Sequence, residues 1–270
     1  MITYRRTPAV LAPTSRVFHA PWVDYLLVLS IPYNLFDVMA ANFTLFSFDE
    51  HLVEHWRESF AELVPDEVKQ RVSFVHSKFE DLKSQFDCIV SPANSFGRFD
   101  GGFDQILTEA LAPMSDQLAL TRTAQHVLYQ RWRGHAPPGT CTLIPLMDTP
   151  CYPNTFDCRY IALCPTMRIP GPVNWHKEIV YNCVWSLLVE IDRHNARAAE
   201  KDSGLTLITS VGMTGLATGI GMVPADVCAR QTATAFAHFH QATTQPEKWS
   251  SLSWPDIMEL RLKTPLPMQY

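Results

Sequence analysis

Short runs of β-branched and aromatic residues alternate in this chain with segments whose apolar residues recur at helical spacing. This alternation is typical of an α/β fold, in which helices cover both faces of a largely parallel sheet. Several of the runs are apolar throughout, as expected for strands buried on both faces. We predict strands at residues 43–48, 71–76, 86–93, 140–146, 160–167 and 205–211. The predicted fold is a three-layer α/β/α sandwich around a mixed sheet of about six or seven strands.

Segments of helical period fill the intervals between these strands. The clearest begins after Asn174 and includes Trp175 and Trp185. A second begins at Pro224, whose fixed φ suits a first helical turn, and a shorter helix is expected at residues 50–63. Because Trp175 and Trp185 belong to a helix that covers the sheet, we expect both rings to be part of the core.

Prolines without helical or strand periodicity gather near both ends of the chain. We therefore predict an irregular N-terminal extension at residues 1–42 and an irregular, Pro-containing C-terminal extension at residues 244–270. Between them, residues 43–243 contain no repeat, low-complexity run or obvious linker, and we expect them to form one domain.

The charge of the chain argues against a polyanion as partner. Its 22 Lys and Arg against 27 Asp and Glu give a formal net charge of −5, so no excess positive field is available to hold nucleic acid. The apolar stretch at residues 22–36 is interrupted by Asp24, Pro32 and Asn34, so no membrane association is expected. Seven scattered cysteines without a C-x-x-C pair are typical of reduced thiols and favour a cytoplasmic or nuclear protein.

Glycine is scarce, with 11 residues in 270, but it is concentrated at two junctions between a strand and a helix. The first, residues 94–104, contains Gly97, Gly101 and Gly102, and the second, residues 212–223, contains Gly212, Gly215, Gly219 and Gly221. Glycine lets backbone N–H groups approach an anion, and the N-terminus of the following helix adds partial positive charge. Neither junction has P-loop or G-x-G-x-x-G spacing. The pair predicts a cleft that holds an extended phosphate group from two sides.

The residues in and before these junctions form recognisable motifs. Ile89-Val90-Ser91-Pro92-Ala93-Asn94 is followed by Gly101-Gly102-Phe103-Asp104, and Thr218-Gly219-Ile220-Gly221 is followed by Pro224 and an Ala-rich helix. The first pair of motifs resembles I-V-N-A-A-N and G-G-G-V-D of the macrodomain family, and the last resembles that family's diphosphate-binding loop. The resemblance covers roughly residues 43–240. Residues 91–97 and 165–167 look like the macro-like branch found in fungi, bacteria and phage.

This resemblance implies binding of ADP-ribose or a derivative and hydrolysis of an ADP-ribosyl linkage, with no metal or other cofactor. Asn94 and Asp104 are the implied catalytic residues. Asn94 would hold the distal ribose, and Asp104 would orient water near the anomeric carbon, where a carboxylate stabilises an oxocarbenium-like state. The implied ligand-binding residues are Ala93, Asn94, Gly101, Gly102, Phe103, Gly215, Thr218, Gly219, Ile220 and Gly221. The implied partner is ADP-ribose or an ADP-ribosylated protein.

Three features depart from the family's motifs. Ser91 replaces the first Asn, and Asp100 replaces a Gly. The family's Asp that reads the adenine amino group would fall near residues 77–80, where no Asp stands in register. Glu80 or Asp81 is the expected substitute.

Other activities are consistent with parts of the sequence. A related hydrolase would remove phosphate from ADP-ribose 1″-phosphate, and a non-catalytic ADP-ribose reader would use the same cleft without turnover. A zinc peptidase is a remote alternative, because His51-Leu52-Val53-Glu54-His55 has the H-x-x-E-H pattern that places two histidines one turn apart on a helix. The sequence indicates no oligomeric state.

Overall fold

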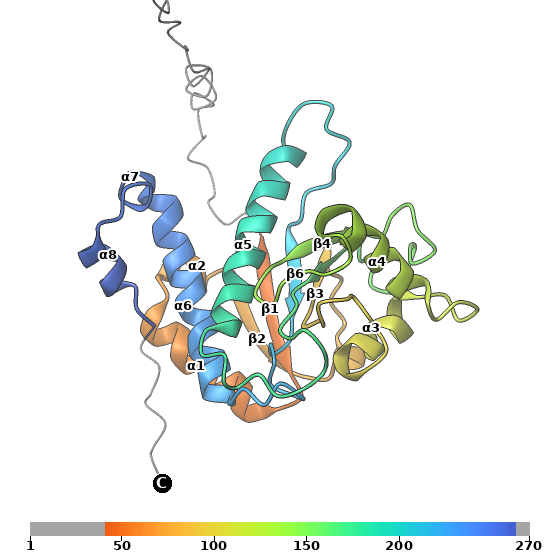
Figure 1. The fold of residues 1–270 in the computed structure, drawn as a ribbon, viewed down its shortest axis with the longest axis horizontal. Coiled ribbons are helices and arrows are strands. Elements are labelled where there is room, and N and C mark those ends of the chain that lie inside the picture. Colours follow the sequence, from red (N-terminus) through yellow and green to blue (C-terminus); the bar gives the residue numbers. More distant parts are fainter. Residues whose placement is uncertain (1–40, 263–270) are drawn as a thin grey trace, which may run out of the picture. The chain divides into compact units, whose positions relative to one another are not determined.

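The computed structural model describes residues 41–262, and in this range six strands form one sheet (Figure 1). The strands are β1 (Asn42–Ser47), β2 (Val72–His76), β3 (Cys88–Ser91), β4 (Thr142–Pro145), β5 (Tyr160–Leu163) and β6 (Ser210–Met213). Their order across the sheet is β2-β1-β6-β3-β5-β4. All neighbours are parallel except β4, which lies at one edge and runs antiparallel to β5. The predicted mixed sheet is therefore confirmed.

Helices cover both faces of this sheet (Figure 1). The main helices are α1 (Glu50–Leu63), α3 (Gly102–Leu111), α4 (Ala119–Trp132), α5 (Ile179–Ala198) and α6 (Ala225–Thr244). Buried residues of α1, α5 and α6 form one hydrophobic cluster, and those of α3 and α4 form another. Side chains alternate along a strand, so Cys88 and Val90 of β3 join the first cluster while Ile89 joins the second. This is the predicted three-layer sandwich.

The helix boundaries follow local capping and burial. Helix α1 occupies the predicted residues, and the Asp49 carboxylate caps it by accepting the His51 N–H at 3.0 Å. Helix α5 begins at Ile179, so the predicted start near Trp175 is wrong. Helix α4 was not predicted. Its inner face is formed by small and apolar residues that recur every fourth position, at Leu120, Ala124 and Leu128.

The C-terminal segment is more regular than its prolines predict. Helices α7 (Pro246–Trp249) and α8 (Trp254–Glu259) lie within it, so the prediction of irregular structure is wrong for these residues. Trp249 stacks on Trp185 of α5 with ring centroids 5.4 Å apart, which attaches α7 to the helical layer. The remaining short elements, α2 (Asp66–Lys69) and η2 (Phe79–Asp81), flank β2.

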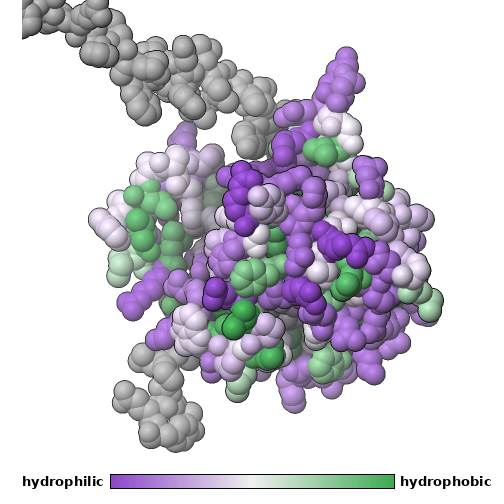
Figure 2. All heavy atoms as spheres, turned by 45° about the vertical axis from the view of Figure 1, so that its right-hand side comes forward, coloured by the Kyte–Doolittle hydropathy of each residue, from purple (hydrophilic) through white to green (hydrophobic). Residues whose placement is uncertain are grey.

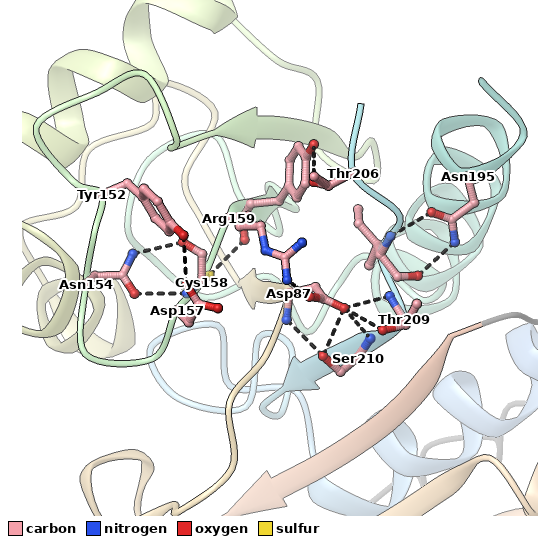
Figure 3. A network of polar contacts seen from close by, with 12 residues as sticks. Asp87, Tyr152, Asn154, Asp157, Cys158, Arg159, Asn195, Thr206, Thr209 and Ser210 are labelled. Carbon is pink, nitrogen blue, oxygen red and sulfur yellow. Dashed lines mark hydrogen bonds and ion pairs between the residues drawn. The ribbon is translucent and has the colours of Figure 1, made fainter. Parts of the chain in front are cut away.

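A polar network fixes the amino ends of β3, β5 and β6 (Figure 3). Oδ2 of Asp87 accepts the N–H groups of Thr209 at 2.8 Å and Ser210 at 3.0 Å, and Oδ1 pairs with Arg159 at 2.9 Å. Burial raises the pKa of Asp87, but the hydroxyl and amide of Thr209 and the Arg159 charge outweigh it, so this pKa lies below its ordinary value. The network thereby holds these three strands in register. The two glycine-containing junctions follow the opposite, carboxyl ends of β3 and β6.

Residues 1–40 and 263–270 lie outside the described part of the chain, and with them the apolar stretch at residues 22–36. Strand β1 begins at Asn42, one residue before the predicted start of the core. Within residues 41–262, no helix is both long enough and apolar enough to cross a membrane.

Candidate functional site

The two glycine-containing junctions follow the carboxyl ends of neighbouring strands, on the same side of the sheet. Strands β3 and β6 are adjacent and parallel, with Ile89 opposite Gly212. Loop 1 (residues 92–101) joins β3 to α3, and loop 2 (residues 214–224) joins β6 to α6. Because neighbouring strands lie about 4.8 Å apart, the two loops start side by side. Open α/β sheets bind ligands at this edge.

The side chain of Asn94 organises loop 1. Its Oδ1 accepts the N–H groups of Phe96 at 3.1 Å and Arg98 at 3.3 Å, and its Nδ2 donates to the Arg98 carbonyl at 2.8 Å. Arg98 in turn pairs with the exposed Asp100, with Nε and Oδ2 2.9 Å apart, which offsets the negative charge of that carboxylate. Asn94 thus shapes the turn that leads to α3. Its contact with a ribose remains a prediction.

Helix α3 begins with an open N-terminus. A Cβ atom added at Gly101 or Gly102 would meet no atom within 4 Å, and Gly102 has a φ of +57°, which favours glycine. Among the described residues, no acceptor contacts the N–H groups of residues 101–104. The half-buried Phe103 ring packs against Phe79 of the core, with ring centroids 5.4 Å apart. These amides suit an anion.

Asp104 is held in the first turn of α3 by Ser91 at the end of β3. The Ser91 hydroxyl donates to Oδ1 of Asp104 at 2.6 Å, and both residues are buried. Oδ2 accepts no hydrogen bond from the described residues and keeps some solvent contact. Burial raises the pKa of Asp104 to about 7, against the opposing effect of the Ser91 hydrogen bond and with a smaller contribution from the Asp100 charge.

Loop 2 is fixed by close backbone packing. Ala217 has a φ of +61°, uncommon for a residue with a side chain, and its carbonyl accepts the Val223 N–H at 3.1 Å. A Cβ atom on Gly221 would lie 2.5 Å from that carbonyl oxygen, whereas one on Gly219 would meet nothing within 4 Å. In the described part of the chain, no acceptor contacts the N–H groups of residues 218–221. Loop 2 therefore presents a second row of free amides.

Two of the predicted ligand-binding residues are packed inside the protein. A Cβ atom on Gly215 would lie 2.6 Å from Cδ2 of Leu52 in α1, so this glycine permits helix packing. Ala93 is buried, and its carbonyl accepts the Thr166 N–H at 3.0 Å. Both residues shape the loops from within. The ligand contacts of the other predicted residues remain predictions.

The segment between β5 and α5 connects the two loops and was not predicted as part of the site. At one end, the Met167 carbonyl accepts the N–H of Ser95 in loop 1 at 2.9 Å. At the other, the Val173 N–H donates to the carbonyl of Gly221 in loop 2 at 2.8 Å. The sequence feature that could have indicated this connection is Pro170-Gly171-Pro172, which turns the chain between these contacts.

The expectation that Trp175 and Trp185 both lie in the core is wrong for Trp175. Trp175 precedes α5, and its side chain is 73% exposed. Its indole N–H donates to the Pro172 carbonyl at 3.2 Å, which fixes the ring at the surface. Trp185 is half-buried and packs edge-on against Phe239 of α6, with ring centroids 5.9 Å apart.

The residues considered for the adenine end lie farther along the same edge. Glu80 and Asp81 are exposed in η2, which follows β2, and β1 separates β2 from β6. Recognition of adenine by Glu80 or Asp81 therefore remains a prediction.

The H-x-x-E-H helix is α1, and its side chains do not converge. Nδ1 of His51 lies 3.7 Å from Glu54, whereas Nδ1 of His55 lies 3.4 Å from Glu58. Within residues 41–262, no three His, Cys, Asp or Glu side chains gather as a metal site would require. The geometry gives no support to a zinc peptidase.

A cavity of about 180 Å³ lies between α1, α6 and residues 259–262, away from both loops. Two of the polar residues in its lining already have partners. Arg230 forms two 3.0 Å hydrogen bonds with Glu62, and Gln231 bonds to the backbones of Lys177 and Tyr181. We therefore place the candidate site at the loops, where donors are free, rather than in this cavity.

No protein-family model and no curated protein matches the chain. Similar solved structures include a mutant of the Oceanobacillus iheyensis macrodomain with ADPR, at 18% identity and a TM-score of 0.43, covering 59% of this chain and 73% of that one. The same macrodomain with ADP also has 18% identity and a TM-score of 0.43, and the match covers 58% of this chain and 70% of that one.

Proposed function

We propose that residues 43–243 form a unit that binds ADP-ribose or a close derivative between loop 1 and loop 2 and hydrolyses an ADP-ribosyl linkage. The binding proposal rests on one observation. Among the described residues, the amides of residues 101–104 and 218–221 have no acceptor, and they lie at the start of α3 and in loop 2, on connections that leave adjacent parallel strands. Two such rows of donors suit the two phosphates of a diphosphate. The motif resemblance supports a nucleotide sugar as the remainder of the ligand.

The proposal of hydrolysis rests on Asp104. Ser91 fixes Oδ1, and Oδ2 keeps solvent contact beside the free amides of α3. A water held by Oδ2 would attack the anomeric carbon as the bond to the leaving group breaks, and Asp104 would accept the water proton. A carboxyl pKa of about 7 suits proton transfer near neutral pH.

Calorimetric titration tests the binding proposal. We expect ADP-ribose to bind more tightly than AMP or ribose 5-phosphate, because only ADP-ribose joins a diphosphate to both sugars. Equal affinity for ADP-ribose and AMP would contradict the proposal.

A non-catalytic reader is the second candidate, because Asp104 is only 6% exposed and one of its oxygens is already occupied by Ser91. An assay for release of ADP-ribose from a modified protein distinguishes a hydrolase from a reader. A hydrolase should lose turnover in Asp104→Ala while keeping much of its affinity for ADP-ribose. A reader would show no turnover with Asp104 present.

A further inference from the structure

All seven cysteines of the chain are buried as free thiols. On the face that Figure 2 shows, hydrophobic residues reach water in small groups among hydrophilic ones, and the thiols contribute almost nothing to that surface. Five of them share the hydrophobic cluster that lies under α1, α5 and α6, namely Cys88, Cys141, Cys164, Cys183 and Cys228. This side of the sheet therefore holds a group of thiols that the proposed function does not use.

Cys141 and Cys164 lie opposite each other at the edge of the sheet. Strand β4 is antiparallel to β5, and one step beyond Thr142, the first residue of β4, the register sets Cys141 opposite Cys164. The two chains remain together beyond this pair, because the Gly139 N–H donates to the Pro165 carbonyl at 2.9 Å. Side chains alternate along a strand, and both thiols belong to the cluster on the same face.

This pair occupies a non-hydrogen-bonded position between β4 and β5. The Leu146 N–H donates to the Arg159 carbonyl at 2.9 Å, and because bonded and non-bonded pairs alternate from there, Cys141 and Cys164 form a non-bonded pair. The Cys164 N–H is accordingly directed away from β4 and donates to the carbonyl of Ser91 in β3 at 2.9 Å. Non-bonded pairs have Cα atoms about 4.5 Å apart, within the range of about 4.4–6.8 Å that disulfides show. The backbone therefore provides the separation that a disulfide requires.

The two thiols also contact each other. The pKa of Cys164 lies well above its ordinary value, first because its thiol is hydrogen-bonded to that of Cys141 and second because it is buried, and the thiols of Cys183 and Cys88 add smaller effects. The Cys183 thiol, on α5, instead donates to the Pro165 carbonyl at 3.4 Å. Within this cluster, Cys141 is thus the partner that Cys164 meets.

We propose that Cys141 and Cys164 are a modification site, at which a peroxide oxidises the two thiols to a disulfide that links β4 to β5. Cys141, next to the edge strand, attacks the peroxide as its thiolate, which forms a sulfenic acid and releases one water. The Cys164 sulfur then attacks the sulfenic sulfur, so the S–S bond forms as a second water leaves. The two electrons lost by the sulfurs reduce the peroxide. This inference does not depend on the proposed function.

Burial determines how this pair should react. Cys141 is 3% exposed and Cys164 is completely buried, so a peroxide reaches them only when the edge of the sheet opens. Strand β4 has β5 as its single neighbour in the described sheet, which makes it the strand that opens most easily. We therefore expect slow oxidation, and a disulfide that resists reduction once the strand has closed again.

The disulfide should stabilise the protein, because it closes a loop over residues 142–163 and so restricts the unfolded chain. We expect the midpoint of thermal unfolding to rise by about 5 °C or more. The chain just beyond Cys164 also supports loop 1, since the Thr166 N–H donates to the Ala93 carbonyl at 3.0 Å. The link would therefore join the edge strand to the strand that holds this loop.

The test treats the reduced full chain with hydrogen peroxide and maps its peptides without reduction by mass spectrometry. We expect one linked pair of peptides that contains Cys141 and Cys164, and a fall by two in the seven thiols that are titrated in denaturant. Dithiothreitol should reverse both this change and the rise in the unfolding midpoint. Because the mapping uses the wild-type chain, its result does not depend on the folding of any variant.

Cys141→Ser should abolish both the linked peptides and the rise in the unfolding midpoint. Cys228→Ser is the matched control, because Cys228 is a buried thiol of the same cluster but lies on α6, and this variant should keep both effects. Failure to find the linked peptides would overturn the inference, and so would a link from Cys141 or Cys164 to Cys183. A link that forms only when the chain is unfolded in urea would overturn it as well, because the native strand pairing would then have no part in it.

Discussion

The hydroxyl of Ser91, at the carboxyl end of β3, donates a 2.6 Å hydrogen bond to the carboxyl of Asp104 in the first turn of α3. Ser91 is completely buried and Asp104 is 6% exposed. The bond connects the strand that precedes loop 1 to the helix that follows it. It fixes the position of the carboxyl at the candidate site, and it partly opposes the rise in the pKa of Asp104 that burial causes.

Asp104 should make the stability of the protein depend on pH. Its pKa is about 7 in the folded protein and 3.8 in its ordinary state, so the folded chain holds the proton more tightly. The contribution of Asp104 to the free energy of unfolding is therefore fully present below pH 3.8, and it is lost as the pH rises through about 7. The difference between these two pKa values corresponds to about 4 kcal/mol of unfolding free energy.

Asp104→Asn should remove this dependence, because the amide stays neutral. We expect the variant to be more stable than wild type at pH 8 and similar to it at pH 4, as measured by urea unfolding. Asp148→Asn, at an exposed position outside both loops, is the control and should keep the wild-type slope. Parallel pH profiles for wild type and Asp104→Asn would show that Asp104 is not the group responsible.

Ser91→Ala should raise the pKa of Asp104 further. The Ser91 hydroxyl donates to the charged carboxylate and lowers this pKa, so its removal leaves the effect of burial less opposed. NMR titration of the Asp104 carboxyl carbon measures the change without any activity assay. Ser95→Ala, at a buried serine that bonds to the Met167 carbonyl instead, should leave this pKa unchanged. An unchanged or lower pKa in Ser91→Ala would contradict the structure at this bond.

The sequence was sufficient to predict five of the strands to within a few residues and the presence of both loops, because buried strands and clustered glycines leave local patterns. The prediction of a strand at 205–211 is wrong for residues 205–209, because β6 begins at Ser210, and Gly212, predicted in the second junction, lies within β6. The sequence did not predict α4, whose Leu120, Ala124 and Leu128 lie among Arg, Gln and Thr residues that obscure the apolar face. Nor could it show that Ser91 holds Asp104. That contact depends on how α3 packs against β3, which no local pattern records.

Trp175 was misplaced for a different reason. Its spacing from the apolar residues of α5 fits a helix, but the helix begins only at Ile179. The preceding backbone is instead bonded to loop 2 through Val173 and Gly221, which are 48 positions apart in the sequence. A tertiary hydrogen bond of this kind overrides local periodicity, and so the connection between the loops was found only in the structure.

Gly219 and Gly221 should respond differently to alanine. Gly219 has open space around it, so Gly219→Ala should change the free energy of unfolding by less than about 0.5 kcal/mol. Its new methyl group would project near the free amides and weaken ADP-ribose binding. Gly221→Ala would place a methyl group 2.5 Å from the Ala217 carbonyl oxygen and should cost about 1–3 kcal/mol of stability.

Thermal unfolding and calorimetric titration separate these two effects. Gly101→Ala is the matching variant on loop 1, because its methyl group would also enter open space. It should likewise keep stability and lose affinity. Full affinity for ADP-ribose in both Gly219→Ala and Gly101→Ala would mean that the ligand does not approach these amides.

Asp87 should stabilise the fold through charge, at the end of the sheet opposite the site. Asp87→Ala would leave the part-buried N–H groups of Thr209 and Ser210 without their acceptor and Arg159 without its partner, so we expect a loss of about 3 kcal/mol at pH 7. Because the folded pKa of Asp87 is lowered, its contribution is present above the ordinary value of 3.8 and is lost as the pH falls through the folded pKa.

The difference in unfolding free energy between wild type and Asp87→Ala should therefore shrink in acid, as measured by urea unfolding at pH 7 and pH 3. Asp66→Ala is the control, because Asp66 pairs with Lys69 at 2.6 Å on the surface, where solvent weakens the pair, and this variant should change stability little.

Because Asp87 holds β3 and β6 together, its loss should also loosen the two loops and reduce ADP-ribose affinity. If Asp87→Ala unfolds like Asp66→Ala, the network at the amino ends of the strands does not hold the sheet in register.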